Sequence, residues 1–61
     1  MIALTLAGEA DGEDVFLNPI NIIAVVANDD DSTDVVCVDQ TVFTVKETPM
    51  QVFNLINNKV N

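Results

Sequence analysis

Two clusters of carboxylates are the residues of this chain most able to do chemistry. One lies at 29–34, with the sequence Asp-Asp-Asp-Ser-Thr-Asp, and the other lies at 9–14. Oxygen-rich loops bind Ca²⁺ in EF-hands, which also need glycine at the sixth position and glutamate at the twelfth. Counting from Asp29, those positions hold Asp34 and Gln40, so the template fails twice. We interpret both clusters as solvated loops, with a weak cation site at 29–34 as the alternative.

Nucleophilic and metal chemistry find few suitable residues. The chain has one cysteine, Cys37, and no histidine, which leaves no Ser-His-Asp triad and no intrachain disulfide. A Cys/His zinc site needs about four such ligands. A catalytic thiol needs a basic neighbour, and because none is near in sequence, Cys37 is interpreted as a small buried hydrophobe.

Other catalytic and ligand-binding patterns are also missing from the sequence. Gly8 and Gly12 belong to no phosphate-binding motif. Acid–base catalysis needs a cleft that raises one carboxyl pKa, and a chain this short encloses little. We predict no catalytic residue, no cofactor, no metal and no enzyme activity.

The charge balance limits the partners. Ten acidic residues face two basic ones, Lys46 and Lys59, for a net charge of −8. Nucleic-acid affinity depends on Lys and Arg neutralising phosphates, so nucleic acid is disfavoured, and an anionic membrane would repel the chain. The charge favours instead a basic protein surface as partner.

Three features bear on the cellular location. No apolar run approaches the roughly 18 residues of a membrane span, the N-terminus lacks the features of a signal peptide, and the thiol is free. We therefore expect a cytoplasmic protein.

The first half of the chain shows strand periodicity. Residues 1–7 alternate between apolar and small or polar positions, and the glycine-rich acidic stretch 8–14 follows as a turn. Residues 14–18 and 20–28 are extended patterns separated by Pro19. Proline lacks the amide hydrogen of a ladder bond and is found at sheet edges or bulges. We predict two segments of one bent strand, or two short strands that meet at a corner.

The second half continues the sheet and ends in a helix. Residues 28–34 are turn formers between valine-rich runs, and strands are expected at 33–38 and 41–47, joined by a tight turn at 39–40. A helix is expected over 49–60, with Thr48 as N-cap, proline at its first position and glutamine three residues after the cap. Its predicted apolar stripe comprises Val52, Phe53, Leu55, Ile56 and Val60.

The stretch 20–27 has the strongest consequence. It is apolar at every position except Asn21, so both faces of a strand built from it must be covered. A domain of 61 residues buries only about 60% of its unfolded surface, and small domains without disulfides or metals gain stability by oligomerisation. The helix covers one face, and barrel closure or a neighbouring subunit covers the other. The predicted self-association surface comprises Ile23, Val25, Val36 and Val38.

Several of these patterns resemble one family, the short flagellar-operon proteins called FlbD, or swarming motility protein SwrD. Such proteins open with a strand at the initiator methionine, turn a Leu-Asn-Pro corner, continue into a valine-rich hairpin and end with a helix after a Val-x-Glu-Ser/Thr sequence. The matching pieces are Ile2 to Leu6, Leu17-Asn18-Pro19 with Ile22 or Ile23, and Val45-Lys46-Glu47-Thr48 followed by Val52 and Ile56. Similar short reading frames occur in phages. The resemblance implies a flagellar-accessory or phage-encoded protein and brings no catalytic residue.

The strand pattern also looks like the architecture of small Sm-like or SH3-like barrels. Sm-like barrels pair their edge strands between subunits to form rings. The basic Arg-Gly turn with which Sm proteins contact RNA is absent from this chain. An Sm-like, ring-forming nucleic-acid binder is therefore kept as the alternative function.

Together these patterns predict a single domain over 1–61. Its class is mainly β, with four to five short antiparallel strands, as a curled sheet or a small Sm-like or SH3-like barrel, and one C-terminal helix. The predicted function is that of a non-enzymatic, self-associating structural or adaptor protein that forms a homo-oligomer.

Overall fold

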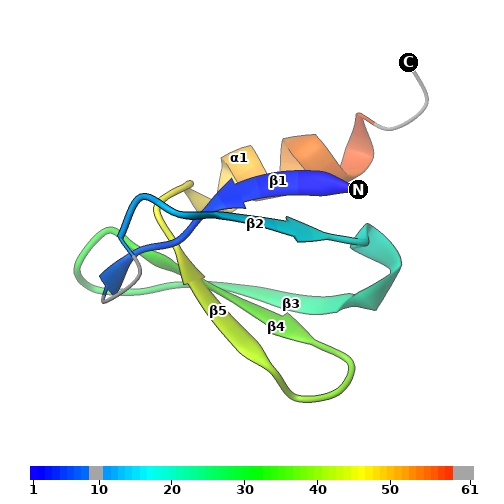
Figure 1. Ribbon diagram of the computed structural model, residues 1–61, viewed down its shortest axis with the longest axis horizontal. Coiled ribbons are helices and arrows are strands. Elements are labelled where there is room, and N and C mark those ends of the chain that lie inside the picture. The colour runs from blue at the N-terminus through cyan, green and yellow to red at the C-terminus, as the bar shows by residue number, and fades with distance from the viewer. Residues whose placement is uncertain (9–10, 59–61) are drawn as a thin grey trace.

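The computed structural model describes residues 1–8 and 11–58, and these residues form five strands and a C-terminal helix (Figure 1). The elements, in chain order, are β1 (Ile2–Thr5), β2 (Asp14–Leu17), a 3₁₀ turn (Pro19–Asn21), β3 (Ile22–Ala27), β4 (Thr33–Cys37), β5 (Val42–Val45) and α1 (Pro49–Asn57). The predicted mainly β class with a C-terminal helix is confirmed. The last residues of the predicted helix and of its stripe, 59 and 60, lie outside the described residues.

The strands form two antiparallel sheets. One contains β1 and β2, and the other has the order β3-β4-β5. A bridge between Leu6 and Val45 connects them, beside backbone hydrogen bonds from Lys46 N to Thr5 O (2.8 Å) and from Ala7 N to Thr44 O (2.9 Å). The arrangement is therefore curled, and the strands do not close into a barrel.

Pro19 produces the predicted corner. Asn18 before it is extended, as the proline ring requires, and its side-chain oxygen accepts a hydrogen bond from Ile20 N at 3.2 Å. A second bond, from Asn21 N to Asn18 O at 2.9 Å, completes the 3₁₀ turn. The turn redirects the chain, so β2 and β3 belong to different sheets. We predicted either one bent strand or two short strands that meet at a corner, and the structure shows the second arrangement.

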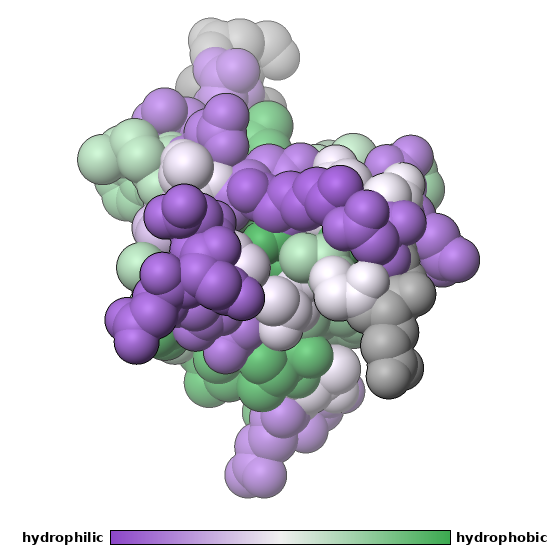
Figure 2. All heavy atoms as spheres, turned by 90° about the vertical axis from the view of Figure 1, so that its left-hand side faces the viewer, coloured by the Kyte–Doolittle hydropathy of each residue, from purple (hydrophilic) through white to green (hydrophobic). Residues whose placement is uncertain are grey.

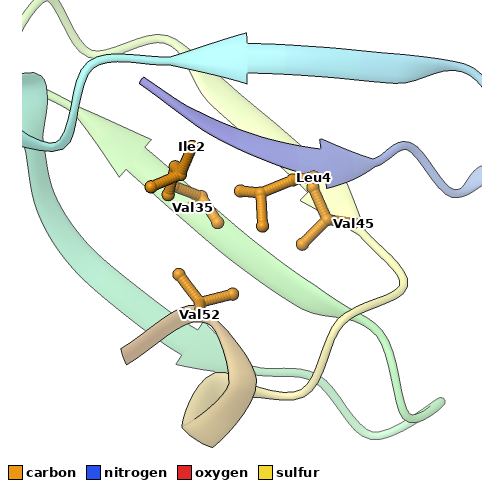
Figure 3. Close-up of a cluster of buried hydrophobic side chains, with 5 residues drawn as sticks. All are labelled: Ile2, Leu4, Val35, Val45 and Val52. Carbon is orange, nitrogen blue, oxygen red and sulfur yellow. The ribbon is translucent and has the colours of Figure 1, made fainter. Parts of the chain in front are cut away.

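A small apolar core lies between the sheets and the helix. Figure 3 shows its buried members, which come from β1, β4, β5 and α1: Ile2, Leu4, Val35, Val45 and Val52. Thr33 is also fully buried, and among residues 1–8 and 11–58 its hydroxyl has no hydrogen-bond partner. The core is thus built mainly from β-branched side chains, which suit a pleated surface.

The position of α1 depends on its N-terminal cap. Gln51 N donates to Thr48 Oγ1 at 3.1 Å, and Thr48 N donates to Gln51 Oε1 at 2.8 Å, which is the predicted capping box. The helix packs against β1 and β3. The predicted stripe is too wide, because Val52 is buried and Ile56 half-buried but Phe53 and Leu55 are exposed. A sheet this small covers only a narrow strip of the helix.

Glu47 fixes the start of the helix to the first strand. Its Oε1 accepts a hydrogen bond from Thr5 N and its Oε2 accepts one from Thr5 Oγ1, both at 2.9 Å. Because Glu47 directly precedes the cap, this bidentate contact joins β1 to the connection between β5 and α1. The sequence carries no pattern that predicts such a contact between residues so far apart.

Candidate functional site

The structure separates the four residues predicted to form a self-association surface. The half-buried Val36 lies on the outer side of the β3-β4-β5 sheet, Val38 is 56% exposed in the turn after β4, and Ile23 is 62% exposed. Val25 pairs with the fully buried Val35 and packs against the core. Val25 and Val36 therefore point to opposite faces of the sheet, and self-association through these four residues stays a prediction.

A β-bulge causes this difference. Ile22 pairs with Cys37, whereas Ala24 pairs with Val36, so Ile23 is an extra residue in β3. An extra residue reverses the alternation of side chains along the rest of the strand. Ile22 and Val25 therefore both face the core, although their positions have opposite parity. Strict alternation, which the sequence pattern assumed, cannot place these side chains correctly.

The region around β3 and α1 has a property that the sequence prediction missed. Residues 19–28 and 49–58 contain no charged side chain, in a chain whose net charge is −8. These two segments are neighbours, because α1 packs against β3. We call residues 19–28 and 49–58 the charge-free flank. The two uncharged runs are visible in the sequence, but only the fold shows that they are adjacent.

The charge-free flank is also rich in exposed apolar side chains. Six large hydrophobic residues on it are exposed: Ile20, Ile23, Val26, Met50, Phe53 and Leu55. A hollow of about 300 Å³ runs between β3 and α1 and is lined by Val25, Pro49, Met50, Phe53 and Ile56. Exposed apolar side chains beside a hollow, such as Met50 and Phe53 here, are typical of an interaction surface. This flank is the candidate site.

Six exposed carboxylates lie at one end of the molecule. The connection between β1 and β2 and the β3–β4 hairpin both lie there, at the left in Figure 1. Figure 2 faces this end and shows hydrophilic side chains over most of it. We call it the acidic end, and its exposed carboxylates are Asp11, Glu13, Asp14, Asp29, Asp30 and Asp31. Lys46 pairs with Asp11 at 3.1 Å across the surface.

Two carboxylates of the β3–β4 hairpin, those of Asp30 and Asp34, accept hydrogen bonds from neighbouring residues. Asp34 Oδ1 accepts bonds from Asn28 Nδ2 (2.9 Å) and Thr44 Oγ1 (2.8 Å), and these bonds lower the pKa of Asp34. Ser32 donates its hydroxyl and backbone amide to Asp30 Oδ1, which lowers the pKa of Asp30. Over residues 1–8 and 11–58, no three His, Cys, Asp or Glu side chains are grouped closely enough to hold a metal ion.

The environment of Cys37 does not favour nucleophilic chemistry. The side chain is 5% exposed, and burial raises the pKa of the thiol, with a further contribution from the negative charge of Asp39. An open pocket of about 370 Å³ borders Cys37, with Phe16, Asn21, Val38 and Phe43 among its lining residues. A thiol held in its neutral form is a poor nucleophile and a poor metal ligand.

Comparison of the chain with models of known protein families, with curated proteins and with solved structures finds no match. No helix among the residues that the structure describes is long and apolar enough to cross a membrane. The resemblance to the FlbD or SwrD proteins thus stays a prediction, and the function has to be argued from the charge-free flank itself.

Proposed function

We propose that this protein is a non-enzymatic, self-associating structural or adaptor protein whose copies meet through the charge-free flank. One observation carries this proposal. In a chain with ten acidic residues, two adjacent uncharged segments expose six large apolar side chains. Burying such surface is worth about 25 cal/mol per Å², and a stable interface needs about 800 Å² from each partner.

The distribution of charge favours a second copy as the partner. A basic protein would be attracted to the acidic end, where six exposed carboxylates lie, and would gain no electrostatic attraction from the flank. A second flank offers a surface that is likewise uncharged and rich in exposed apolar side chains, and a two-fold interface brings the same surface of two copies together. Two copies joined by their flanks also keep the acidic ends away from the interface. A basic protein surface remains the expected additional partner of that end.

The alternative, an Sm-like nucleic-acid binder, gains no support from a specific feature. Lys46 is occupied by its ion pair with Asp11. We therefore retain the structural or adaptor role. We place the protein in the cytoplasm, where thiols such as that of the buried Cys37 stay reduced. A flagellar-accessory or phage-encoded role is the biological setting that the family resemblance suggests.

Analytical ultracentrifugation of two matched variants tests the proposal. Phe53 on the flank is 57% exposed, and Val38, outside the flank in the turn after β4, is 56% exposed. We expect Phe53→Gln to weaken self-association at least about tenfold, which is about 1.4 kcal/mol, and Val38→Gln to leave it within about twofold. A wild-type protein that is monomeric at micromolar concentration would refute self-association. Equal effects of the two variants would place the interface elsewhere.

A further inference from the structure

Strand β3 has a free edge on the side opposite β4. It is the outer strand of its sheet, and α1 contacts it by packing rather than by continuing the ladder. The bond from Asn28 N to Ser32 O identifies this pair as hydrogen-bonded in the β3–β4 register. Since such pairs alternate in antiparallel sheets, Ala24 and Val26 also point their amides towards β4. The N–H and C=O groups of Val25 and Ala27 consequently point to the free edge.

This edge lacks the devices with which proteins usually protect exposed strands. Proteins place lysine, proline or inward-pointing charge on an edge, or cover it. Residues 22–27 contain neither a charge nor a proline. The bulge at Ile23 protects only the start of the strand, so the regular part, 24–27, remains available. In the ranges described, no hydrogen bond links the edge-facing groups of Val25 and Ala27 to another residue.

Exposed apolar side chains border the edge on both sides. Ile23 and Val26 lie beside it on β3, and Met50 and Phe53 lie beside it on α1, across the hollow that Val25 lines. A strand added along this edge would therefore gain ladder bonds and would cover apolar surface above and below the sheet. A partner that packed on the outer face alone would leave the edge and the helix exposed.

We propose that two copies of this chain pair antiparallel along β3, centred on Val26, to form one continuous six-stranded sheet. The proposal rests on the self-association proposed above and specifies its geometry. With Val26 opposite Val26 of the other copy, Val25 of each copy exchanges two hydrogen bonds with Ala27 of the other. The two-fold axis is perpendicular to the sheet, so both helices lie on the same side and their Met50 and Phe53 side chains meet near the axis.

Repulsion between carboxylates favours the antiparallel over the parallel direction of pairing. The hairpin tip with Asp29, Asp30 and Asp31 follows the C-terminal end of β3. Antiparallel pairing sends the two tips to opposite ends of the joined sheet, whereas parallel pairing would bring six carboxylates together. Like charges placed opposite one another across an interface are strongly unfavourable. The same repulsion disfavours an interface formed by the acidic ends of two copies.

Disulfide cross-linking tests the geometry directly. Residues opposite each other in a non-hydrogen-bonded antiparallel pair have Cα atoms about 4.5 Å apart, within the range that a disulfide spans. Val26 is 49% exposed and Val42, on β5, is 51% exposed, so the two give a matched pair of sites. Under mild oxidation we expect Val26→Cys to form a cross-linked dimer in most of the chains and Val42→Cys to form almost none. The native Cys37 is buried and serves as its own control in the wild type.

A second pair of variants needs no cross-link. A lysine on an edge strand blocks pairing, so Val26→Lys should weaken association at least about tenfold while Val42→Lys leaves it nearly unchanged. Equal cross-linking, or equal loss of association, at the two sites in a protein that does self-associate would overturn the β3 geometry and leave the proposed function standing. A wild type that stays monomeric, with no cross-link at Val26→Cys, would overturn both.

Discussion

The charge-free flank and the acidic end differ in what they do with their polar groups. At the acidic end, Asp30 accepts hydrogen bonds from Ser32, Asp34 accepts hydrogen bonds from Asn28 and Thr44, and Asp11 pairs with Lys46. On the flank, six large apolar side chains are exposed, and the edge-facing backbone groups of Val25 and Ala27 have no hydrogen-bond partner among the described residues. One region is therefore complete in the monomer, and the other is not. Incomplete surface of this kind is where a second molecule gains most free energy.

The largest difference in stability is expected between charged substitutions at two neighbouring residues of β3. Val25 faces the core and Val26 faces solvent. Val25→Asp should destabilise the folded chain by at least about 2–4 kcal/mol, because a charge would be placed against apolar side chains. That loss is comparable to the whole stability of a domain this small. Val26→Asp should leave the fold intact and weaken only association.

Urea unfolding followed by circular dichroism, at a concentration where the chain is monomeric, measures the difference. Similar midpoints for Val25→Asp and Val26→Asp would mean that the bulge does not set the faces of β3 as described. The same experiment also defines the extent of the flank. Side chains whose substitution lowers the unfolding midpoint stabilise the fold, and the others are available to a partner.

The acidic end should show a smaller effect that depends on pH. Hydrogen bonds from Asn28 and Thr44 hold the pKa of Asp34 below its ordinary value in the folded state. The stability from this group is thus present above the unfolded pKa of about 3.9 and is lost as the pH falls through the lower folded pKa. Asp34→Asn keeps an acceptor oxygen but removes the titration.

Acid titration of folding compares the two chains. We expect the wild type to lose more stability than Asp34→Asn as the pH falls below about 4, since only the wild type loses a hydrogen-bonded carboxylate. Parallel curves for the two proteins would show that the hydrogen bonds from Asn28 and Thr44 to Asp34 do not contribute to stability. Association through the flank, which contains no titrating group, should not depend on Asp34.

The sequence predicted the elements better than it predicted their surfaces. Proline at the corner, the capping box at Thr48 and the valine-rich hairpin are local signals, and each appears in the structure. The bulge at Ile23 was not predictable, because nothing in an apolar run marks which residue is the extra one. Its consequence, the inward position of Val25, was therefore missed.

The candidate site shows the same limit. Both uncharged runs, 19–28 and 49–58, can be read from the sequence, but their adjacency depends on how α1 docks. Periodicity placed Phe53 and Leu55 in the buried stripe, whereas the small sheet covers little beyond Val52 and Ile56. The exposed side chains that result are the ones that define the flank.

The molar mass of the wild type as a function of salt concentration tests the central claim most directly. Each copy carries a net charge of −8, and the proposed interface carries none, so salt screens the repulsion between copies without weakening the contact. We expect light scattering at micromolar concentration to show a dimer whose dissociation constant falls as NaCl rises from about 0.05 to about 0.5 M. A mass that stays at 6.6 kDa across this range, or a dimer that dissociates as salt is added, would contradict an interface at the charge-free flank.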